Sequence, residues 1–528
     1  MQDNKWGSRI IYQIYPRSFK DSNSDGIGDL QGIRNKLDYL KDLGIDAIWL
    51  SPIYPSPMHD FGYDISDYKN VDPIFGNLKD FDELIAKAHS INIKILMDFV
   101  PNHTSFEHPW FKESRSSKKN PKRDWYIWRG SDKKEKAPNN WLSQFGGSAW
   151  ELDRTTEEYY LHTFDVSQPD LNWRNLQVVE EMLNTMRFWL ERGVDGFRVD
   201  VAYILYKDPF FRDEPSNSNY LPEHHMIYDS LLHVYTTALP ETIEMLKKFN
   251  EVINEFDDRF MVCEIYTFTH EIVNLYKIVD HYSFAPFNFS FISIPWNAFE
   301  QKKFLDEFDG LVGDKYFPTY VLGNHDQPRI ATRLGDKAAR SAALLQLTLR
   351  GTPFIYYGEE LGMKNVDVPD EKVLDPIALN MKDFNFGRDP ERGPMQWDKK
   401  EFAGFSDSEP WLPLEKDYTD KNVSSEKNDP KSFLNLYKKL IYLRKNLKAL
   451  NSGKYIPLDL KNKNVFGFIR EYDDQRVLIL VNFSGEEQTA KLPKGNWRKI
   501  LSTQMDTFEG IDKDQIIFMP SEGFILTN

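Results

Sequence analysis

The 528-residue sequence has one cysteine, no long apolar run and no excess of positive charge. The single Cys263 excludes an internal disulfide, and it is expected to be a small buried side chain. No apolar stretch approaches the length of about 18 residues that a membrane-spanning helix needs. A net charge of −15 argues against nucleic acid or an anionic membrane as a partner. No signal-peptide pattern precedes the first expected strand, so the expected location is the cytoplasm, although a signal that had been removed would leave the same sequence.

Short apolar stretches typical of buried strands alternate with amphipathic stretches typical of helices over most of the chain. The expected strands are 9–15, 45–50, 93–99, 194–200, 260–265, 280–284, 317–322 and 353–357. The clearest helical stretches are 29–42, 178–192, 241–256 and 431–448. This alternation predicts the α/β class and a closed parallel (β/α)8 barrel, formed by 1–103 and 174–450.

Two irregular stretches and a change of pattern predict what is added to the barrel. Residues 104–173 are rich in Trp, Pro, Gly, Asn and charge, and a structureless loop of that length is improbable in a compact domain. We therefore expect a small inserted domain there, after the third strand and at the mouth of the barrel. Residues 359–430 are also expected over the mouth. From 451 to 528, short alternating segments separated by Asp, Gly and Asn predict a C-terminal antiparallel β-sandwich domain.

Polar clusters stand at the ends of four expected strands. They are Asp98-Phe-Val-Pro-Asn-His103, Gly196-Phe-Arg-Val-Asp200, Cys263-Glu264-Ile-Tyr266 and Gly323-Asn-His-Asp326. Chemistry at the carboxyl ends of parallel strands is the pattern of a barrel active site. The clusters bring together carboxylates, histidines and an arginine, which suits acid/base and nucleophilic chemistry on a neutral polyol.

Two of the carboxyl groups suit complementary roles, one ionised and nucleophilic and the other protonated and acidic. Asp200 and Arg198 lie two residues apart, so both side chains face the barrel mouth, and the guanidinium is expected to keep the Asp200 carboxylate ionised. Glu264 has apolar neighbours and nearby anions, which should favour a protonated side chain that can act as an acid. The ordinary alternatives are a surface Asp–Arg pair and a loop glutamate.

The four clusters, in this order and spacing, resemble glycoside hydrolase family 13, the α-amylase family. The resemblance covers nearly the whole chain. Closer markers are similar to those of oligo-1,6-glucosidases and α-glucosidases: Asp60-Phe-Gly-Tyr-Asp-Ile65, Gln168-Pro-Asp-Leu-Asn172 and Arg392-Gly-Pro-Met-Gln-Trp-Asp398. The resemblance implies an exo-acting, retaining α-glucosidase that releases terminal glucose from short oligosaccharides through a covalent glucosyl-enzyme.

The resemblance also implies a role for each matched residue. Asp200 would be the nucleophile, Glu264 the acid/base and Asp326 the third catalytic carboxylate, which binds substrate hydroxyls. Asp98 would orient the site or support Arg198. The residues expected to bind substrate are Asp60, Tyr63, His103, Arg198, His325, Arg392, Phe145 and Phe164. The two phenylalanines would pack over the second sugar, or else belong to the core.

Linkage preference and reaction outcome stay open at this stage. In relatives, Val at the position of Val201 accompanies α-1,6 activity, whereas the segments 150–153 and 159–164 are similar to those of animal-type maltases, which favour α-1,4 bonds. A transglucosylase or sucrose isomerase would use the same residues. A non-catalytic relative, such as a transporter subunit with this fold, would have degraded motifs and a membrane helix, and neither feature is found in the sequence.

A loop near the N-terminus, Asp21-Ser-Asn-Ser-Asp-Gly-Ile-Gly-Asp29, is a candidate calcium site. Its oxygen ligands would be Asp21, Asn23, Asp25, Asp29 and the carbonyl of Ile27, at the spacing of a calcium-binding loop that lacks the final glutamate. The resemblance implies a structural Ca2+ at this place, and the alternative is an Asp/Gly turn without metal. No organic cofactor is expected, and the oligomeric state is not predicted.

Overall fold

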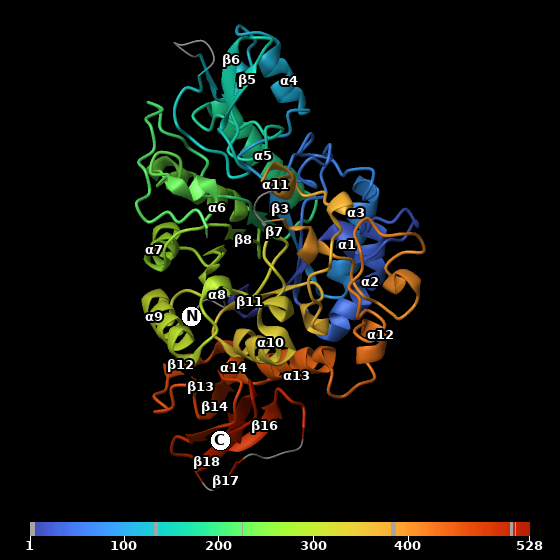
Figure 1. The fold of residues 1–528 in the computed structure, drawn as a ribbon, viewed down its shortest axis with the longest axis vertical. Helices are drawn as coiled ribbons and strands as arrows, with labels where there is room; N and C mark the ends of the chain where they lie inside the picture. The colour runs from blue at the N-terminus through green and yellow to red at the C-terminus, as the bar shows by residue number, and fades with distance from the viewer. Residues whose placement is uncertain (1–5, 131–135, 224, 382–386, 507–510, 513) are drawn as a thin grey trace.

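The structure is a computed structural model that describes residues 6–130, 136–223, 225–381, 387–506, 511–512 and 514–528. Figure 1 shows an elongated molecule in three tiers. The barrel lies in the middle, the segment inserted after β3 lies at one end, and the C-terminal sheets lie at the other.

The central sheet has eight parallel strands. Their order is β10-β11-β1-β2-β3-β7-β8-β9, and every hydrogen-bonded pair of neighbours is parallel. The strands are β1 (Ile11–Ile14), β2 (Ala47–Leu50), β3 (Lys94–Phe99), β7 (Gly196–Val199), β8 (Phe260–Cys263), β9 (Phe284–Pro286), β10 (Thr319–Val321) and β11 (Thr352–Tyr356). Nearly every strand residue is buried, as expected for a parallel sheet that is covered on both faces. The predicted (β/α)8 fold class is confirmed.

A side chain, rather than a ladder of backbone bonds, joins the two ends of this sheet. Thr319 on β10 donates its hydroxyl to the carbonyl of Pro286 on β9, at 3.0 Å. The same hydroxyl accepts the N–H of Asn288, at 3.1 Å. Because Pro286 has no N–H to give to a ladder, the threonine hydroxyl supplies the missing link.

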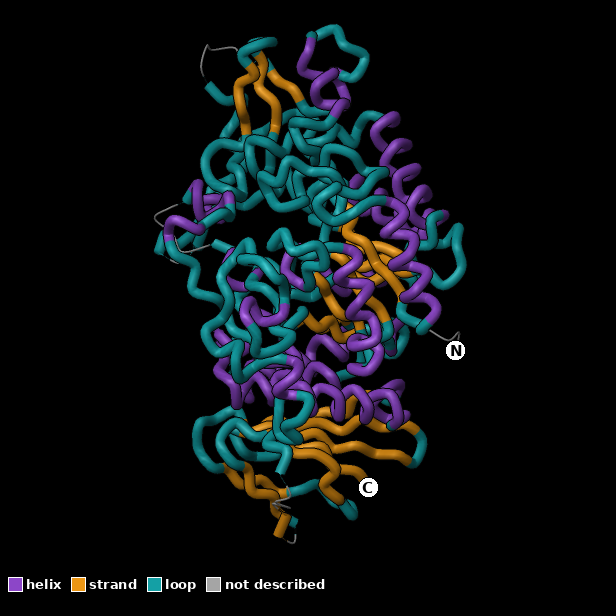
Figure 2. The backbone as a smooth tube through the Cα atoms, turned by 90° about the vertical axis from the view of Figure 1, so that its right-hand side faces the viewer, coloured by secondary structure: helices purple, strands orange, loops and turns teal. Residues whose placement is uncertain are grey.

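Helices surround the strands, as Figure 2 shows from the side. The longer ones are α2 (Leu30–Leu43), α3 (Leu78–Ser90), α5 (Leu176–Glu191), α6 (Pro240–Ile253), α7 (Thr269–Val279), α9 (Ala298–Val312), α10 (Ile330–Thr348) and α13 (Phe433–Asn446). Local sequence explains where several begin: Asp29 and Asn77 cap α2 and α3 by accepting backbone N–H groups of the first turn. The predicted helices agree with α2, α5, α6 and α13 to within three residues at each end.

One expected strand was misplaced. Residues 280–284 were predicted as the sixth strand, but β9 begins only at Phe284. Helix α7 continues to Val279 and ends at Asp280, which has the left-handed conformation with φ 51°. His281 and Ser283 then hydrogen-bond to each other within the turn. Residues 280–283, which were predicted to begin the strand, therefore form the end of α7 and the turn after it.

The inserted segment between β3 and α5 has its own small sheet. It contains α4 (Pro109–Ser116) and an antiparallel sheet of β4 (Trp128–Arg129), β6 (Glu158–Leu161) and β5 (Trp150–Asp153), in that order. Phe111 stacks on Trp128 with ring centroids 5.6 Å apart. A buried ion pair ties the segment to the barrel, since Lys207 Nζ lies 3.0 Å from Asp170 Oδ2 and 3.0 Å from Asn102 Oδ1.

The C-terminal tier consists of two antiparallel sheets. The larger has the order β12-β13-β14-β19-β16 and the smaller β15-β18-β17. The strands are β12 (Lys454–Pro457), β13 (Val465–Tyr472), β14 (Gln475–Asn482), β15 (Gln488–Lys491), β16 (Arg498–Ser502), β17 (Ile511–Asp512), β18 (Gln515–Phe518) and β19 (Gly523–Thr527). Phe466, Ile479 and Ile525 belong to the same apolar cluster as the barrel core. The two tiers thus share one core.

Short helices fill the connections, and most of them lie in the stretch after β11. The α-helices are α1 (Pro16–Phe19), α8 (Ser290–Ser293), α11 (Pro376–Asn380), α12 (Val423–Glu426) and α14 (Lys448–Ser452). The 3-10 helices are η1 (Trp6–Ser8), η2 (Arg123–Trp125), η3 (Ile227–Ser230), η4 (Glu359–Leu361), η5 (Asp370–Lys372), η6 (Asp389–Arg392) and η7 (Glu401–Gly404).

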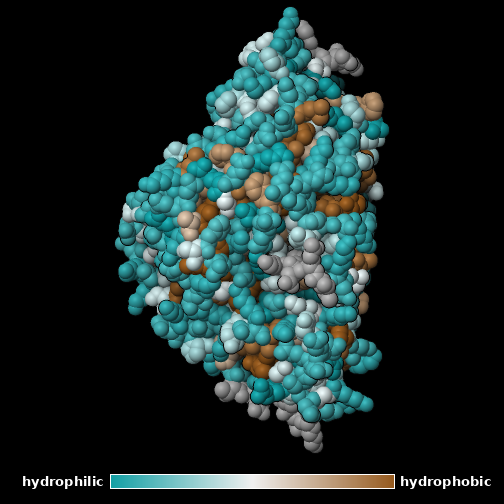
Figure 3. Space-filling view, turned by 180° about the vertical axis from the view of Figure 1, so that it is seen from behind, coloured by the Kyte–Doolittle hydropathy of each residue, from teal (hydrophilic) through white to brown (hydrophobic). Residues whose placement is uncertain are grey.

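The outer surface is mainly polar. Figure 3 shows one face on which hydrophilic side chains predominate and apolar ones form separate small patches. In the part of the chain that the structure describes, no helix has both the length and the apolar character to cross a membrane.

Candidate active site

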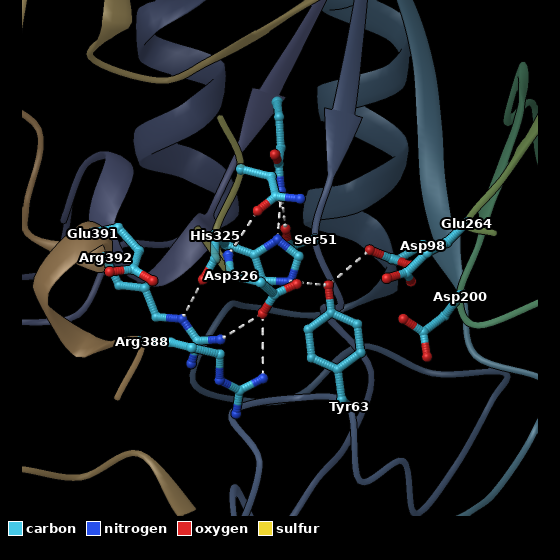
Figure 4. A network of polar contacts seen from close by, with 12 residues as sticks. Ser51, Tyr63, Asp98, Asp200, Glu264, His325, Asp326, Arg388, Glu391 and Arg392 are labelled. Carbon is cyan, nitrogen blue, oxygen red and sulfur yellow. Dashed lines mark hydrogen bonds and ion pairs between the residues drawn. The ribbon is translucent and has the colours of Figure 1, made fainter. Parts of the chain in front are cut away.

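The predicted catalytic side chains meet at the carboxyl ends of the barrel strands (Figure 4). Asp98 lies on β3, Asp200 follows β7, and Glu264 follows β8. Asp326 comes five residues after the end of β10. Asp200 and Glu264 are buried, at 6% and 4% exposure, whereas the Asp326 side chain is 21% exposed. The parallel sheet therefore gathers polar groups that the sequence separates by more than 200 residues.

Arg198 is the centre of this group. Its Nη1 lies 2.7 Å from Asp98 Oδ1 and 2.7 Å from Asp200 Oδ1. Its Nη2 contacts Glu264 Oε2. The guanidinium is only 1% exposed, so one buried cation contacts three carboxyl groups.

Because three carboxyl groups share one cation, the neighbouring charges shift the pKa of Asp200. Burial raises the pKa of Asp200 well above its ordinary value; Arg198 lowers that pKa, but Glu264 and Asp98 raise it further. Burial also raises the pKa of Asp98 to about 6, against the opposing effect of Arg198. Arg198 lowers the pKa of Asp200, which is the direction expected from the sequence, but burial and the other two carboxyl groups oppose it.

Val201 connects Asp200 to Glu264 through a strained backbone. Its φ is +35°, which a β-branched residue rarely adopts. In this conformation its N–H donates to Glu264 Oε2 at 3.1 Å. The Val201 side chain is buried in an apolar cluster with Phe145, Phe164, Ile204, Ile377 and Met381. Packing of the side chain therefore holds the strained turn that aims an N–H at Glu264.

Asp326 is held by two arginines. Its Oδ1 accepts from Arg388 Nη1 and from Arg392 Nη2, each at 3.2 Å. Although burial opposes it, the contact with His325 and the charges of Arg388 and Arg392 lower the pKa of Asp326 far below its ordinary value. Asp326 is thus an anion at the edge of the site.

Arg388 was not among the predicted residues, yet it pairs with more carboxylates of the site than Arg392 does. Its Nη2 lies 2.6 Å from Asp60 Oδ1 and 2.6 Å from Asp375 Oδ1. Arg392 instead donates Nε to the backbone carbonyl of His325, at 2.9 Å, and is 1% exposed. The only sequence signal was its position in the irregular stretch that also holds Arg392, four residues earlier in the chain.

Asp60, Gln168 and His103 form a polar wall beside Arg388. Gln168 Nε2 donates to Asp60 Oδ2 at 3.0 Å and lies 3.2 Å from His103 Nε2. Burial raises the pKa of Asp60 to about 6, against the effect of Arg388 and Arg392. Burial lowers the pKa of His103 to about 4, so its imidazole is neutral at neutral pH.

Phe145 and Phe164, the two phenylalanines of the inserted segment, pack against Arg388 and His103. The Phe164 ring lies 5.2 Å from the His103 ring, and the Arg388 guanidinium lies 5.2 Å from the Phe145 ring centroid. Phe145 is 5% exposed and Phe164 is 8% exposed. Both side chains are therefore largely buried in the apolar cluster that contains Val201. This favours the alternative that they belong to the core, with only a small part of each ring exposed.

A neutral cavity of about 260 Å3 is lined in part by Tyr266, which follows Glu264 by two residues in the chain. Tyr266 and Phe289 stack at its edge with ring centroids 4.9 Å apart. The remaining lining residues are Ile265, Thr267, Ile272, Ser290, Ile292, Ser293 and Gln327. None of the described lining residues carries a charge.

The candidate calcium loop is closed by its own side chains. Asp21 Oδ1 accepts the N–H groups of Asn23 and Ser24, and Oδ2 accepts the N–H of Gly26. Asp25 accepts the N–H of Ile27. Over the residues that the structure describes, no three His, Cys, Asp or Glu side chains are grouped so as to hold a metal ion. Oxygen donors of the kind that Ca2+ prefers are present, but a site would also need amide and carbonyl oxygens. Calcium stays a prediction.

Comparison with known proteins agrees with this architecture. The family model for the alpha amylase catalytic domain matches residues 13–453, and the model for the alpha-amylase SusG C-terminal domain matches residues 465–516. An alpha-glucosidase of Apis mellifera is 42% identical, covering 92% of this chain and 87% of its own length. An oligo-1,6-glucosidase of Parageobacillus thermoglucosidasius is 39% identical, covering 98% of both. The crystal structure of an alpha-glucosyl transfer enzyme, XgtA, has a TM-score of 0.93 and 36% identity over 99% of each chain. The chain belongs to the α-amylase family, glycoside hydrolase family 13, and is a glycoside hydrolase.

Proposed function

We propose that the protein is a retaining, exo-acting α-glucosidase that hydrolyses terminal α-linked glucose from short oligosaccharides. The observation that carries the proposal is the pair Asp200 and Glu264, which stand at the ends of adjacent strands and share one buried guanidinium. A retaining glycosidase requires one carboxylate that attacks and one carboxyl group that gives up a proton.

The reaction would proceed by double displacement. An Asp200 oxygen attacks the anomeric carbon while Glu264 gives its proton to the departing glycosidic oxygen, which leaves a β-glucosyl ester on Asp200. Glu264, now a carboxylate, takes a proton from water as that water attacks the same carbon. Asp200 departs as a carboxylate, Glu264 is protonated again, and glucose is released with its α-configuration retained.

The contacts of the two carboxyl groups fit this sequence. The mechanism needs Glu264 to hold one proton and Asp200 none when the substrate is bound. A bound glycosidic oxygen offers Glu264 an acceptor, and the proton then belongs on Glu264. Arg198, at 2.7 Å from Asp200, stabilises the nucleophile as an anion at the same moment.

Support for the exo mode comes from the polar wall and from Arg388 beside it. Asp60, Arg388 and Asp375 form buried ion pairs there, and Gln168 links Asp60 to His103. If these groups close the end of the site, the hydroxyls of a terminal glucose would find both donors and acceptors on them. Asp326, with its pKa lowered, would accept hydrogen bonds from these hydroxyls.

The cavity lined by Tyr266 favours a neutral leaving group. It offers aromatic faces and hydroxyls but no cation among its described lining residues, so a phosphorylated sugar would lose its hydration without gaining a partner. An α-1,6 linkage is slightly favoured, from Val201 and from the oligo-1,6-glucosidase relative, while the alpha-glucosidase relative keeps α-1,4 bonds plausible.

A second candidate is glucosyl transfer by the same residues, including sucrose isomerisation. It is supported by the fold similarity to the alpha-glucosyl transfer enzyme. It is also supported by aromatic side chains on the leaving-group side, since Tyr266 is 44% exposed and Phe268 is 73% exposed. Such faces could hold an acceptor sugar in the place of water.

The test is glucose release from equal concentrations of maltose, isomaltose and sucrose, with all products resolved by chromatography. The proposal expects glucose, with isomaltose cleaved fastest. New disaccharides would favour the transfer candidate, and preference for maltose or sucrose would favour a maltase-type enzyme. If none of the three is cleaved, and Asp200→Asn behaves like the wild type, the exo-glucosidase proposal fails.

A further inference from the structure

Gln13 is a buried polar residue that none of the sequence motifs includes. It lies on β1, is 1% exposed, and is flanked by the apolar residues of a barrel strand. Its Nε2 lies 2.9 Å from His325 Nδ1 and 3.3 Å from Ser51 Oγ. A glutamine amide at the bottom of the site is therefore placed against a ring nitrogen of His325.

A chain of short polar contacts continues from His325 toward the nucleophile (Figure 4). His325 Nε2 lies 2.6 Å from the Tyr63 hydroxyl, and that hydroxyl lies 3.1 Å from Asp98 Oδ2. Arg198 then joins Asp98 to Asp200. All members are buried, so no water competes for these contacts and each donor must face an acceptor.

The direction of each hydrogen bond follows from the carboxylate of Asp98. A carboxylate only accepts, so the Tyr63 hydroxyl proton points at Asp98, where the Trp49 indole N–H also donates at 3.1 Å. The Tyr63 oxygen must then accept, which requires a proton on Nε2 of His325. The Asp326 carboxylate, 3.3 Å from the same Nε2, independently requires a donor there.

These constraints leave Nδ1 of His325 without a proton, and Gln13 is the group that faces it. We propose that Gln13 is a positioning residue that holds His325 in its Nε2–H tautomer by donating its amide N–H to Nδ1. The alternative tautomer would turn a lone pair toward the Asp326 carboxylate and would withdraw the Tyr63 proton from Asp98. Gln13 thus acts on the nucleophile through four intervening residues.

The arrangement holds while Asp98 is ionised and His325 is neutral. Burial lowers the pKa of His325 to about 3, and the pKa of Asp98 is raised to about 6. Above about pH 6 the ionised Asp98 therefore fixes the direction of each hydrogen bond between Gln13 and Asp98. Below about pH 6, Asp98 is protonated and no longer fixes these directions. The charged and titratable groups that face His325 are Asp326, Arg392, Arg198, Arg388, Tyr63 and Tyr15. Those that face Asp98 are Arg198, Glu264, Asp200, Tyr63 and Tyr54.

The experiment is 15N NMR of the full-length protein labelled on histidine, at pH 7.5, with the His325 signals identified by their loss in His325→Asn. We expect a protonated Nε2 and a bare Nδ1 in the wild type. Gln13→Glu places a carboxylate, which only accepts, against Nδ1, so the proton should move to Nδ1. With this change we expect kcat to fall roughly 10- to 100-fold, the scale for residues that orient a histidine, and the acid limb of the kcat profile to shift.

Two further variants separate positioning from packing. Gln13→Met keeps the volume but offers no donor, so both tautomers should be populated and kcat should fall less than in Gln13→Glu. Gln346→Met is the matched control, because this buried amide donates to the backbone carbonyls of Tyr320 and Phe354 and not to the site. It should lower the melting temperature and leave the His325 tautomer and kcat unchanged.

The proposal is overturned if the wild type carries its proton on Nδ1, or if Gln13→Glu folds with an unaltered tautomer and kcat. If the variants do not fold, the wild-type spectrum still shows which nitrogen of His325 carries the proton. The kcat readout rests on the proposed function, whereas the tautomer does not, so an absence of sugar cleavage with the expected spectrum would reject the α-glucosidase proposal and leave the role of Gln13 intact.

Discussion

Arg198 shows how single residues set the charge of the site. Its guanidinium contacts Asp98, Asp200 and Glu264, and no exposed cation could do so, because solvent would weaken each contact. Removing one partner of a buried ion pair is costly, since the remaining charge stays buried without compensation. Loss of Arg198 would therefore destabilise the folded protein, because it would leave three buried carboxyl groups without their cation.

Asp60→Asn tests the cost of the buried charges directly. The pKa of Asp60 is raised from 3.8 to about 6 in the folded state, so the folded state binds more protons than the unfolded state between these values. The stability that this carboxyl contributes is fully present below pH 3.8 and is lost as the pH rises through about 6. At pH 8 the ionised group costs about 3 kcal/mol, which the asparagine avoids.

We therefore expect the denaturation midpoint of Asp60→Asn, relative to that of the wild type, to rise as the pH is raised from 4.5 to 8, while the loss of the Arg388 partner lowers the midpoint at every pH. Urea denaturation at several pH values measures it. Asp474→Asn, at an exposed turn, is the control and should show no such trend. A difference that is constant with pH would contradict the raised pKa of Asp60.

Val201→Ala and Val201→Thr test the origin of linkage preference. The Val201 side chain is buried beside the nucleophile and its backbone N–H contacts Glu264, so its shape sets the space near the scissile bond. We expect both variants to lower kcat/KM for isomaltose relative to maltose by several-fold. An unchanged ratio would remove this residue from the account of specificity.

At the scale of elements, the strands were predictable because each is a short apolar run bounded by polar residues. Strand β7, for example, is completely buried and is followed at once by Asp200. The error at 280–284 arose where a helix end and a strand start are both apolar, and only the left-handed Asp280 separates them. Local periodicity does not carry that information.

The site was predictable where side chains follow strands and was missed where they come from elsewhere. Asp200, Glu264 and Asp326 stand in motifs at strand ends. Arg388 comes from an irregular stretch whose path depends on the ion pair with Asp375, and nothing in the neighbouring residues reports that contact. Gln13 lies within an apolar strand, and a single polar residue in such a strand gives no sequence signal of a functional role.

The loop from Asp21 to Asp29 is an element whose metal remains to be tested, and we propose that it binds a structural Ca2+. Binding to the folded state alone adds about 2.7 kcal/mol when free Ca2+ is a hundredfold above Kd. We expect a chelator to lower the melting temperature and added Ca2+ to restore it. Asp25→Asn should abolish this response, whereas Asp407→Asn should retain it, because Asp407 is not a proposed ligand and accepts a long hydrogen bond from Ser24 of the loop. A melting temperature indifferent to chelator would reject the site.

At the scale of the whole molecule, the barrel and the C-terminal sheets are joined by a continuous core. Arg470 on β13 is completely buried and donates to the carbonyls of Thr348, at the end of α10, and Gly453. Phe466 and Ile479 pack within the barrel's own apolar cluster. Neither part can lose its structure without exposing the other.

We therefore expect one cooperative thermal transition by calorimetry, with the calorimetric and van't Hoff enthalpies in agreement. Arg470→Met should lower the temperature of that single transition. Two separated transitions in the wild type, one of them accounting for the C-terminal sheets, would contradict the shared core.

The central claim is that Asp200 forms a covalent bond with glucose. The most direct measurement is to mix the enzyme with a slow fluorinated α-glucosyl substrate, stop the reaction with acid, and map the modified peptide by mass spectrometry. The account predicts one glucosyl adduct on the peptide that contains Asp200, absent from Asp200→Asn. An adduct on another residue, or no adduct together with β-glucose as the first product, would contradict it.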